Sequence, residues 1–171
     1  MGLSQPRWQK CLGSLFFGVL VLGYPASVMA KDLSSRLGVG YKDQFYTSTP
    51  SIAVQYYPGP SLGFSLALGV DTQESNSRFG LMAKLYRVIF QEDNMNFYMG
   101  SGAGLLSEEV NNKNQSGFEL NGFVGAEFFL PGLESLGFSF EAGVAVTSVS
   151  SQVRFRTFGD SPLRAGMIFY F

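Results

Sequence analysis

Residues 62–70 read Leu-Gly-Phe-Ser-Leu-Ala-Leu-Gly-Val, a strict alternation of large apolar residues with small ones. The same period of two runs through residues 118–130, where an apolar set alternates with a set that includes Glu119, Asn121 and Glu127. A helix would mix the two sets around its axis, whereas a β-strand places them on opposite faces. The alternation therefore predicts strands that separate two unlike environments.

Similar alternation predicts eight strands along the chain. They cover residues 34–41, 50–57, 62–71, 78–90, 95–106, 117–130, 136–148 and 161–171, and the last can extend upstream through 153–156. Several of these strands have the roughly 9–11 residues that a tilted strand needs to cross a bilayer.

The predicted connections alternate between short and long. Short turns at 58–61, 91–94 and 131–135 follow the second, fourth and sixth strands. Longer polar segments follow the others, at 43–49, 71–77, 107–116 and 149–160. This asymmetry is typical of outer-membrane barrels, whose short turns face the periplasm. An even strand count then places both termini on the periplasmic side.

Aromatic residues gather beside the predicted short turns, as in the girdle at a membrane–water interface. They are Tyr56, Tyr57, Phe90, Phe97, Tyr98, Phe128, Phe129, Phe138 and Phe140. In lipid every backbone N–H and C=O must be paired, so a spanning sheet has to close. The predicted fold class is an all-β, closed antiparallel up-and-down transmembrane β-barrel of about eight strands. A secreted β-sandwich is the alternative, but its outer face would carry more Lys, Glu and Thr.

The first thirty residues have the three parts of a secretory signal peptide. Two basic residues precede an apolar stretch at 12–24, and Ala-Ser-Val-Met-Ala at 26–30 supplies a cleavage site. The apolar stretch is shorter than the roughly 20 residues of a membrane-spanning helix. We therefore expect a cleaved signal peptide at 1–30 and a barrel domain at 31–171.

Composition argues against several functional classes. The single cysteine, Cys11, belongs to the signal segment, and the whole chain has no histidine. A disulfide scaffold and a thiol enzyme are thereby excluded, and the commonest general base and metal ligand is missing. The mature chain keeps ten of the 12 basic residues and all 13 acidic ones, a net charge of −3. A weakly acidic chain without basic runs is not expected to bind nucleic acid.

The chain ends Leu-Arg-Ala-Gly-Met-Ile-Phe-Tyr-Phe, with Met167, Phe169 and Phe171 on one face of the last strand. This ending resembles the C-terminal signal by which outer-membrane barrels are recognised for assembly. Residues 31–171 as a whole resemble the small outer-membrane β-barrel domain family. The resemblance implies that Met167, Phe169 and Phe171 recruit the barrel assembly machinery. We expect that machinery and outer-membrane lipids as partners, and a monomeric barrel.

The face opposite the lipid-facing set points into the lumen. Its mid-strand charges are Lys84, Glu127, Glu141 and Arg164. Burying such charges without partners is costly, so we expect a mutually satisfied ion-pair network. Glu141 and Arg164 lie on neighbouring strands and can pair directly. Asp71, Arg78 and Glu119 lie nearer the loops and are expected to be hydrated.

Three kinds of function remain open for such a lumen. An ion-paired plug indicates a structural or surface-interaction role in the cell envelope, whereas a polar constriction would make a narrow pore. The inward glycines leave space that Tyr86, Tyr98 and Phe123 can refill, or that can bind or pass a small hydrophobic molecule. A lipid-modifying enzyme is the third class, but the enzymes that resemble this fold rely on a histidine. We therefore predict a non-enzymatic protein with no catalytic, cofactor or metal site; Ser101, in a Gly-Ser-Gly motif, is expected to face lipid.

Overall fold

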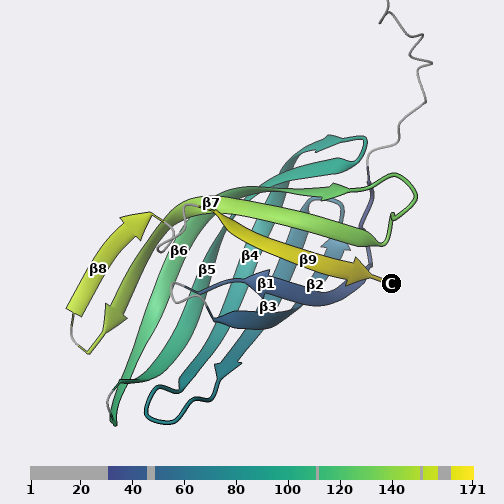
Figure 1. Cartoon of the computed structure of the whole chain (residues 1–171). Coiled ribbons are helices and arrows are strands. Elements are labelled where there is room, and N and C mark those ends of the chain that lie inside the picture. Colours follow the sequence, from purple (N-terminus) through teal and green to yellow (C-terminus); the bar gives the residue numbers. More distant parts are fainter. Residues whose placement is uncertain (1–30, 46–48, 111, 151, 158–162) are drawn as a thin grey trace, which may run out of the picture.

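A computed structural model describes residues 31–45, 49–110, 112–150, 152–157 and 163–171, so the predicted signal peptide at 1–30 lies outside the described residues. Within them, nine strands form one antiparallel sheet (Figure 1). They are β1 (Leu37–Asp43), β2 (Pro50–Gly59), β3 (Leu62–Asp71), β4 (Arg78–Glu92), β5 (Met95–Val110), β6 (Lys113–Phe129), β7 (Leu136–Val149), β8 (Gln152–Thr157) and β9 (Arg164–Tyr170). Among these residues, no helix is long and apolar enough to span a membrane.

The sheet closes on itself. Each strand from β1 to β7 pairs with the next along the chain, and β9 pairs with β7 on one edge and β1 on the other. β8 pairs with the second half of β7, whereas β9 pairs with its first half, so the two share one position in the wall. The prediction of a closed, antiparallel, eight-stranded up-and-down barrel is confirmed. The upstream extension expected at 153–156 is β8, separate from β9.

The two faces of each strand are those that the alternation predicts. In β3 every second residue from Leu62 to Val70 is exposed on the outside, while the residues between them are buried in the lumen. In β6 Phe118, Leu120 and Val124 are exposed, whereas Glu119, Asn121 and Phe123 are buried. The protein therefore has its packed core inside the barrel and an apolar outer surface.

Several strand boundaries differ from the prediction, and local contacts explain those of β1, β5 and β6. β1 begins at Leu37 instead of residue 34, because Asp32 accepts hydrogen bonds from the backbone N–H (2.8 Å) and hydroxyl (2.5 Å) of Ser34. The turn that these bonds hold continues into Ser35, whose φ is 60°. The segment 107–116 is mostly strand, because β5 and β6 pair out to Val110 and Lys113 instead of forming a long loop.

The short turns and the C-terminus lie at the same end of the barrel (Figure 1). Outward aromatic rings surround this end, and Phe128 stacks on Phe138 and Phe140 with ring centroids 5.5 and 5.7 Å apart. Three rings assigned to this girdle belong to the lumen instead: Tyr57, Tyr98 and Phe129 are buried. Their place follows from strand parity, since each is one residue away from an outward aromatic neighbour.

Candidate functional site

Six charged side chains lie buried in the lumen of the described barrel. They are Lys42 on β1, Lys84 on β4, Glu119 and Glu127 on β6, Glu141 on β7 and Arg164 on β9. Three cations and three carboxylates give this set a formal charge of zero. Buried charges are tolerated only with partners that replace water, so the arrangement of these six decides whether the lumen is closed or hydrated.

Glu141 is the centre of the middle cluster. Its Oε2 lies 2.5 Å from Nζ of Lys84, and its Oε1 lies 3.2 Å from Nζ of Lys42. The hydroxyl of Tyr98 donates a third hydrogen bond to Oε1, at 3.2 Å. The lysine ammonium groups also lie over aromatic rings, with Lys84 4.5 Å from the centroid of Phe123. One carboxylate thus satisfies donors from β1, β4 and β5.

A second cluster lies nearer the long-loop end. Arg164 donates from Nη2 to Oε1 of Glu119 at 3.0 Å and from Nη1 to the backbone carbonyl of Gln44 at 2.6 Å. The side-chain amide of Asn121 donates to the same Glu119 oxygen, at 3.0 Å. Glu119 is 0% exposed. This arginine therefore joins β9 to β6 and holds the residue that follows β1.

The third cluster surrounds Glu127 near the short turns. Tyr170 donates to its Oε1 at 2.7 Å, and Tyr57 donates to its Oε2 at 3.2 Å. The amide of Gln55 donates to the hydroxyls of Tyr170 (2.7 Å) and Tyr57 (2.9 Å). Neutral hydroxyl and amide donors therefore surround this carboxylate, in contrast with the ammonium groups around Glu141.

The four lumen charges singled out from the sequence are thus divided among three clusters. Lys84 and Glu141 contact each other, Arg164 lies in the second cluster and Glu127 in the third. Glu141 and Arg164 are register neighbours, but the expectation of a direct side-chain pair is wrong. Their side chains extend toward different strands, because the lysines and Glu119 supply partners across the lumen.

Sequence reasoning missed two members of these clusters. The predicted first strand ends at Tyr41, one residue before Lys42, although Gly38, Gly40 and Lys42 share one parity. The expectation of a hydrated Glu119 is also wrong, since it is buried against Arg164. Parity counted to the true end of each strand would have found both.

Aromatic rings fill the space that the inward glycines leave. Consecutive centroids along Phe129, Tyr170, Tyr57, Tyr86, Tyr98 and Phe123 lie 5.3–6.3 Å apart. A Cβ added at Gly63 would lie 2.5 Å from the ring of Tyr86, and one at Gly125 would lie 2.8 Å from that of Tyr98. These glycines therefore accommodate the rings of Tyr86 and Tyr98.

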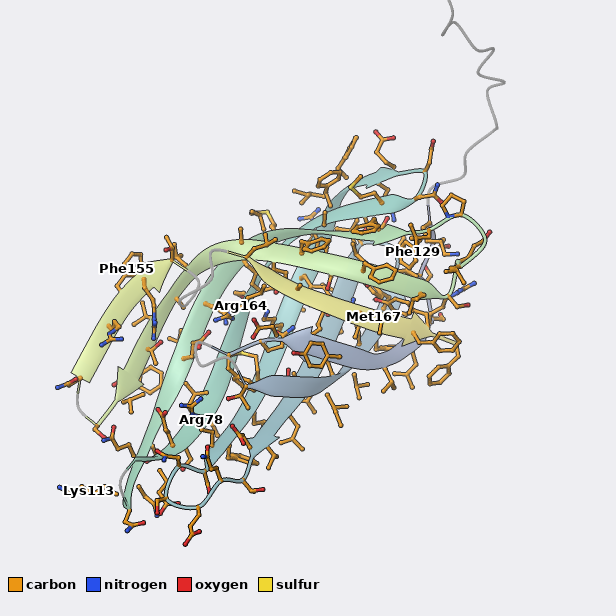
Figure 2. The ribbon with its side chains drawn as sticks, viewed as in Figure 1. Arg78, Lys113, Phe129, Phe155, Arg164 and Met167 are labelled. Carbon is orange, nitrogen blue, oxygen red and sulfur yellow. The ribbon has the colours of Figure 1, made fainter. Side chains whose placement is uncertain are left out.

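The residues of the C-terminal motif all face outward. Met167, Phe169 and Phe171 are exposed, while Ile168 and Tyr170 between them are buried in the lumen. Figure 2 shows Met167 on β9, near the C-terminal end of the barrel. Ser101 of the Gly-Ser-Gly motif is also exposed on the outer face. No group of three or more potential acidic, His or Cys metal ligands is present among the described residues.

Comparisons with known proteins support the fold. No family model matches the chain, and no curated protein matches it. Among solved structures, it is similar to the N-terminal β-barrel domain of OprF from Pseudomonas aeruginosa, with a TM-score of 0.54 and 12% sequence identity. The match covers 81% of this chain and 98% of that domain. At this low identity the likeness shows a shared architecture: the chain folds as a small β-barrel of the same kind.

Proposed function

We propose that this protein is a non-enzymatic β-barrel of a bacterial outer membrane, with a structural or surface-interaction role in the cell envelope. The observation that carries the proposal is the combination of an apolar exterior with a lumen closed by paired charges and packed rings. Both chain ends of the barrel, at Lys31 and Phe171, would then face the periplasm, and outer-membrane lipids would surround a monomer.

The outer surface supports a lipid environment. Its exposed residues include Ile52, Leu66, Val70, Leu105, Leu120, Val124 and Phe169. Soluble monomers rarely expose a continuous apolar area larger than a few hundred Å², and this set lies on strands all around the wall. A closed barrel is one of the two architectures that satisfy every backbone hydrogen bond in lipid. Most strands also reach or exceed the roughly 9–11 residues needed for a crossing.

The packing of side chains in the lumen supports a barrel that does not conduct ions. An eight-stranded barrel is about as wide as its side chains can fill. Here the clusters around Glu127, Glu141 and Glu119 occupy successive depths, and the column of rings joins the first two. A hydrated pore would need polar groups facing water, whereas these polar groups contact one another.

The outward face of the last strand supports assembly by the barrel assembly machinery. Every second side chain at the end of the chain is apolar and exposed on the outer surface: Met167, Phe169 and Phe171. A recognition site on β9 must be accessible to the assembly machinery before the barrel closes. Side chains on the outward face stay accessible after closure as well. We therefore propose these three residues as the assembly signal.

Two measurements test the proposal. Electrophoresis of the outer-membrane fraction with and without boiling should give two mobilities, as expected of a stable barrel. Purified protein reconstituted in planar bilayers should give no stepwise conductance, while the double variant Y86A/Y98A, which removes two rings of the column, should conduct. Substitution of the outward Tyr56 by Ala is the matched control, and this variant should give no stepwise conductance. Regular open-channel steps from the unmodified protein would refute the closed lumen.

A further inference from the structure

We infer that the long-loop mouth of the barrel holds a binding pocket for a phosphate group, formed by Arg154 and Arg156 of β8 with Thr147 of β7. The pocket is separate from the lumen clusters and goes beyond the proposed envelope role. The lipid-headgroup source of the phosphate rests on the proposed function, which places the barrel in a membrane.

The register of the β7–β8 hairpin brings these side chains to one face. Arg154 is opposite Thr147, and Arg156 is opposite Ala145. Thr147 is in turn opposite the buried Glu119 of β6, so the shared face is the inner one. Two arginines two residues apart on a strand are roughly 7 Å apart and point the same way. The hairpin thus aims two guanidinium groups over the mouth.

A partly open cavity of about 290 Å³ lies at this position. Its described lining consists of Gln115, Thr147, Val149, Ser150, Gln152, Arg154 and Arg156, and none of these residues is acidic. Thr147 is only 3% exposed, and its hydroxyl has no hydrogen-bond partner within the described structure. A buried hydroxyl normally has a hydrogen-bond partner. A ligand oxygen in the cavity can accept the hydrogen bond that the Thr147 hydroxyl does not make within the barrel.

The charges around the cavity favour an anion. Within the described part of the chain, Arg154 has no carboxylate partner. Two acids near the mouth already have cations: Glu108 lies 3.2 Å from Nε of Arg78, and Glu119 lies 3.0 Å from Nη2 of Arg164. Guanidinium groups bind phosphate through two parallel N–H bonds, which makes arginine the usual residue for this ligand. Amide and hydroxyl groups of the lining add neutral donors.

The position of β8 indicates two possible sources of the phosphate. In the described residues β8 pairs with β7 alone, and an unpaired strand edge is not tolerated in hydrocarbon. The hairpin must therefore lie above the hydrocarbon, at the level of lipid headgroups or beyond it. Its outer face carries Val153 and Phe155, 73% and 69% exposed, which suit the interface. Figure 2 labels Phe155 on β8. The phosphate can accordingly belong to a lipid headgroup or to a soluble phosphomonoester.

Two probes distinguish these sources with the full barrel. Inorganic phosphate is titrated against protein in zwitterionic detergent, and binding is followed by ³¹P line broadening. Separately, the protein is placed in nanodiscs of phosphatidylcholine with one tenth phosphatidic acid, and retained lipid is measured by native mass spectrometry. Binding of both probes supports a site open to either source, and retention of phosphatidic acid alone assigns the site to a headgroup.

The test variant is R154Q/R156Q, and the matched control is R78Q/K113Q, which removes two cations from the same end of the barrel (Figure 2). We expect at least tenfold weaker binding in the first and less than twofold change in the second. T147V, which keeps shape but removes the hydroxyl, should weaken binding by about tenfold or more, as for the loss of a hydrogen bond to a charged group.

Equal losses in both double variants would overturn the pocket, because binding would then follow overall charge. The pocket would also be refuted if the unmodified protein bound neither inorganic phosphate nor phosphatidic acid. Each sample is also run unboiled and boiled. A barrel that shifts normally but binds no phosphate refutes the pocket alone, whereas loss of the mobility shift in the unmodified protein refutes the proposed function.

Discussion

Removal of the Glu141 carboxylate is the most direct test of the filled lumen. In the variant Glu141→Ala, Lys42 and Lys84 lose the group that both contact, at 3.2 and 2.5 Å. Neither ammonium can turn to water, because the two lysine side chains are 1% and 0% exposed. The variant must therefore bury two ammonium groups without this carboxylate, admit water or discharge a lysine.

The expected loss follows from the cheapest of these responses. Discharging one lysine at pH 7, from its ordinary pKa of about 10.4, costs about 4–5 kcal/mol. Removing one partner of a buried ion pair generally costs about 3–5 kcal/mol. We therefore expect the free energy of unfolding to fall by about 3–5 kcal/mol, a large part of the roughly 5–15 kcal/mol typical of a folded domain.

Urea titration in detergent micelles, read by the mobility difference between folded and unfolded protein, measures this loss. With a urea dependence of roughly 1–3 kcal/mol per molar, the midpoint should move by more than about 1 M. Glu134→Ala is the control, because Glu134 forms a solvent-exposed pair with Lys31 at 3.0 Å and should cost no more than about 1 kcal/mol. The combination E141L/K42M/K84M should recover stability, since apolar side chains replace both ammonium groups together with the carboxylate. Equal midpoints for Glu141→Ala and Glu134→Ala would refute the reasoning, as would a triple variant no better than the single one.

The remaining predictions concern other parts of the barrel. Glu119→Ala should lower the free energy of unfolding by about 3–5 kcal/mol in the same titration, because it removes the carboxylate that the buried Arg164 contacts at 3.0 Å; a loss below about 1 kcal/mol, typical of an exposed pair, would show a hydrated contact. Gly63→Ala should cost about 1–3 kcal/mol by overpacking against Tyr86, whereas Gly122→Ala, with no atom within 4 Å of the added Cβ, should change stability by less than about 1 kcal/mol. Phe171→Ser should reduce heat-modifiable protein in the membrane fraction without changing its synthesis, and normal assembly would argue against the terminal signal.

The inner and outer faces were predictable because they depend on local geometry. In a strand, parity alone decides the side to which a residue points, so Leu66 faces out and Lys84 faces in wherever the strand lies in the wall. Errors arose where the ends of strands were misjudged. Lys42 lies just beyond the predicted end of the first strand and was therefore not counted among the inward residues. At the other end of β1, the hydrogen bond between Asp32 and Ser34 sets the start of the strand, and alternation does not reveal such a bond.

The partners of the lumen charges were not predictable from parity. Register places Glu141 beside Arg164 on adjacent strands, yet Glu141 contacts lysines from β1 and β4, across the lumen. Such contacts depend on barrel diameter, strand stagger and side-chain length together. The division of Glu127 from the other charges has the same origin, since its tyrosine partners come from β2 and β9.

By itself, then, the sequence determined a closed barrel with an apolar outside and a polar inside, because a period of two and the need to pair every backbone group in lipid leave one architecture. Only the tertiary structure decided how the lumen is filled and that the last wall position is shared by β8 and β9. The physical reason is that side chains from strands far apart in the chain meet only after closure. The cavity beside Arg154 and Thr147 has a different origin, the register of the β7–β8 hairpin, which alternation alone does not give.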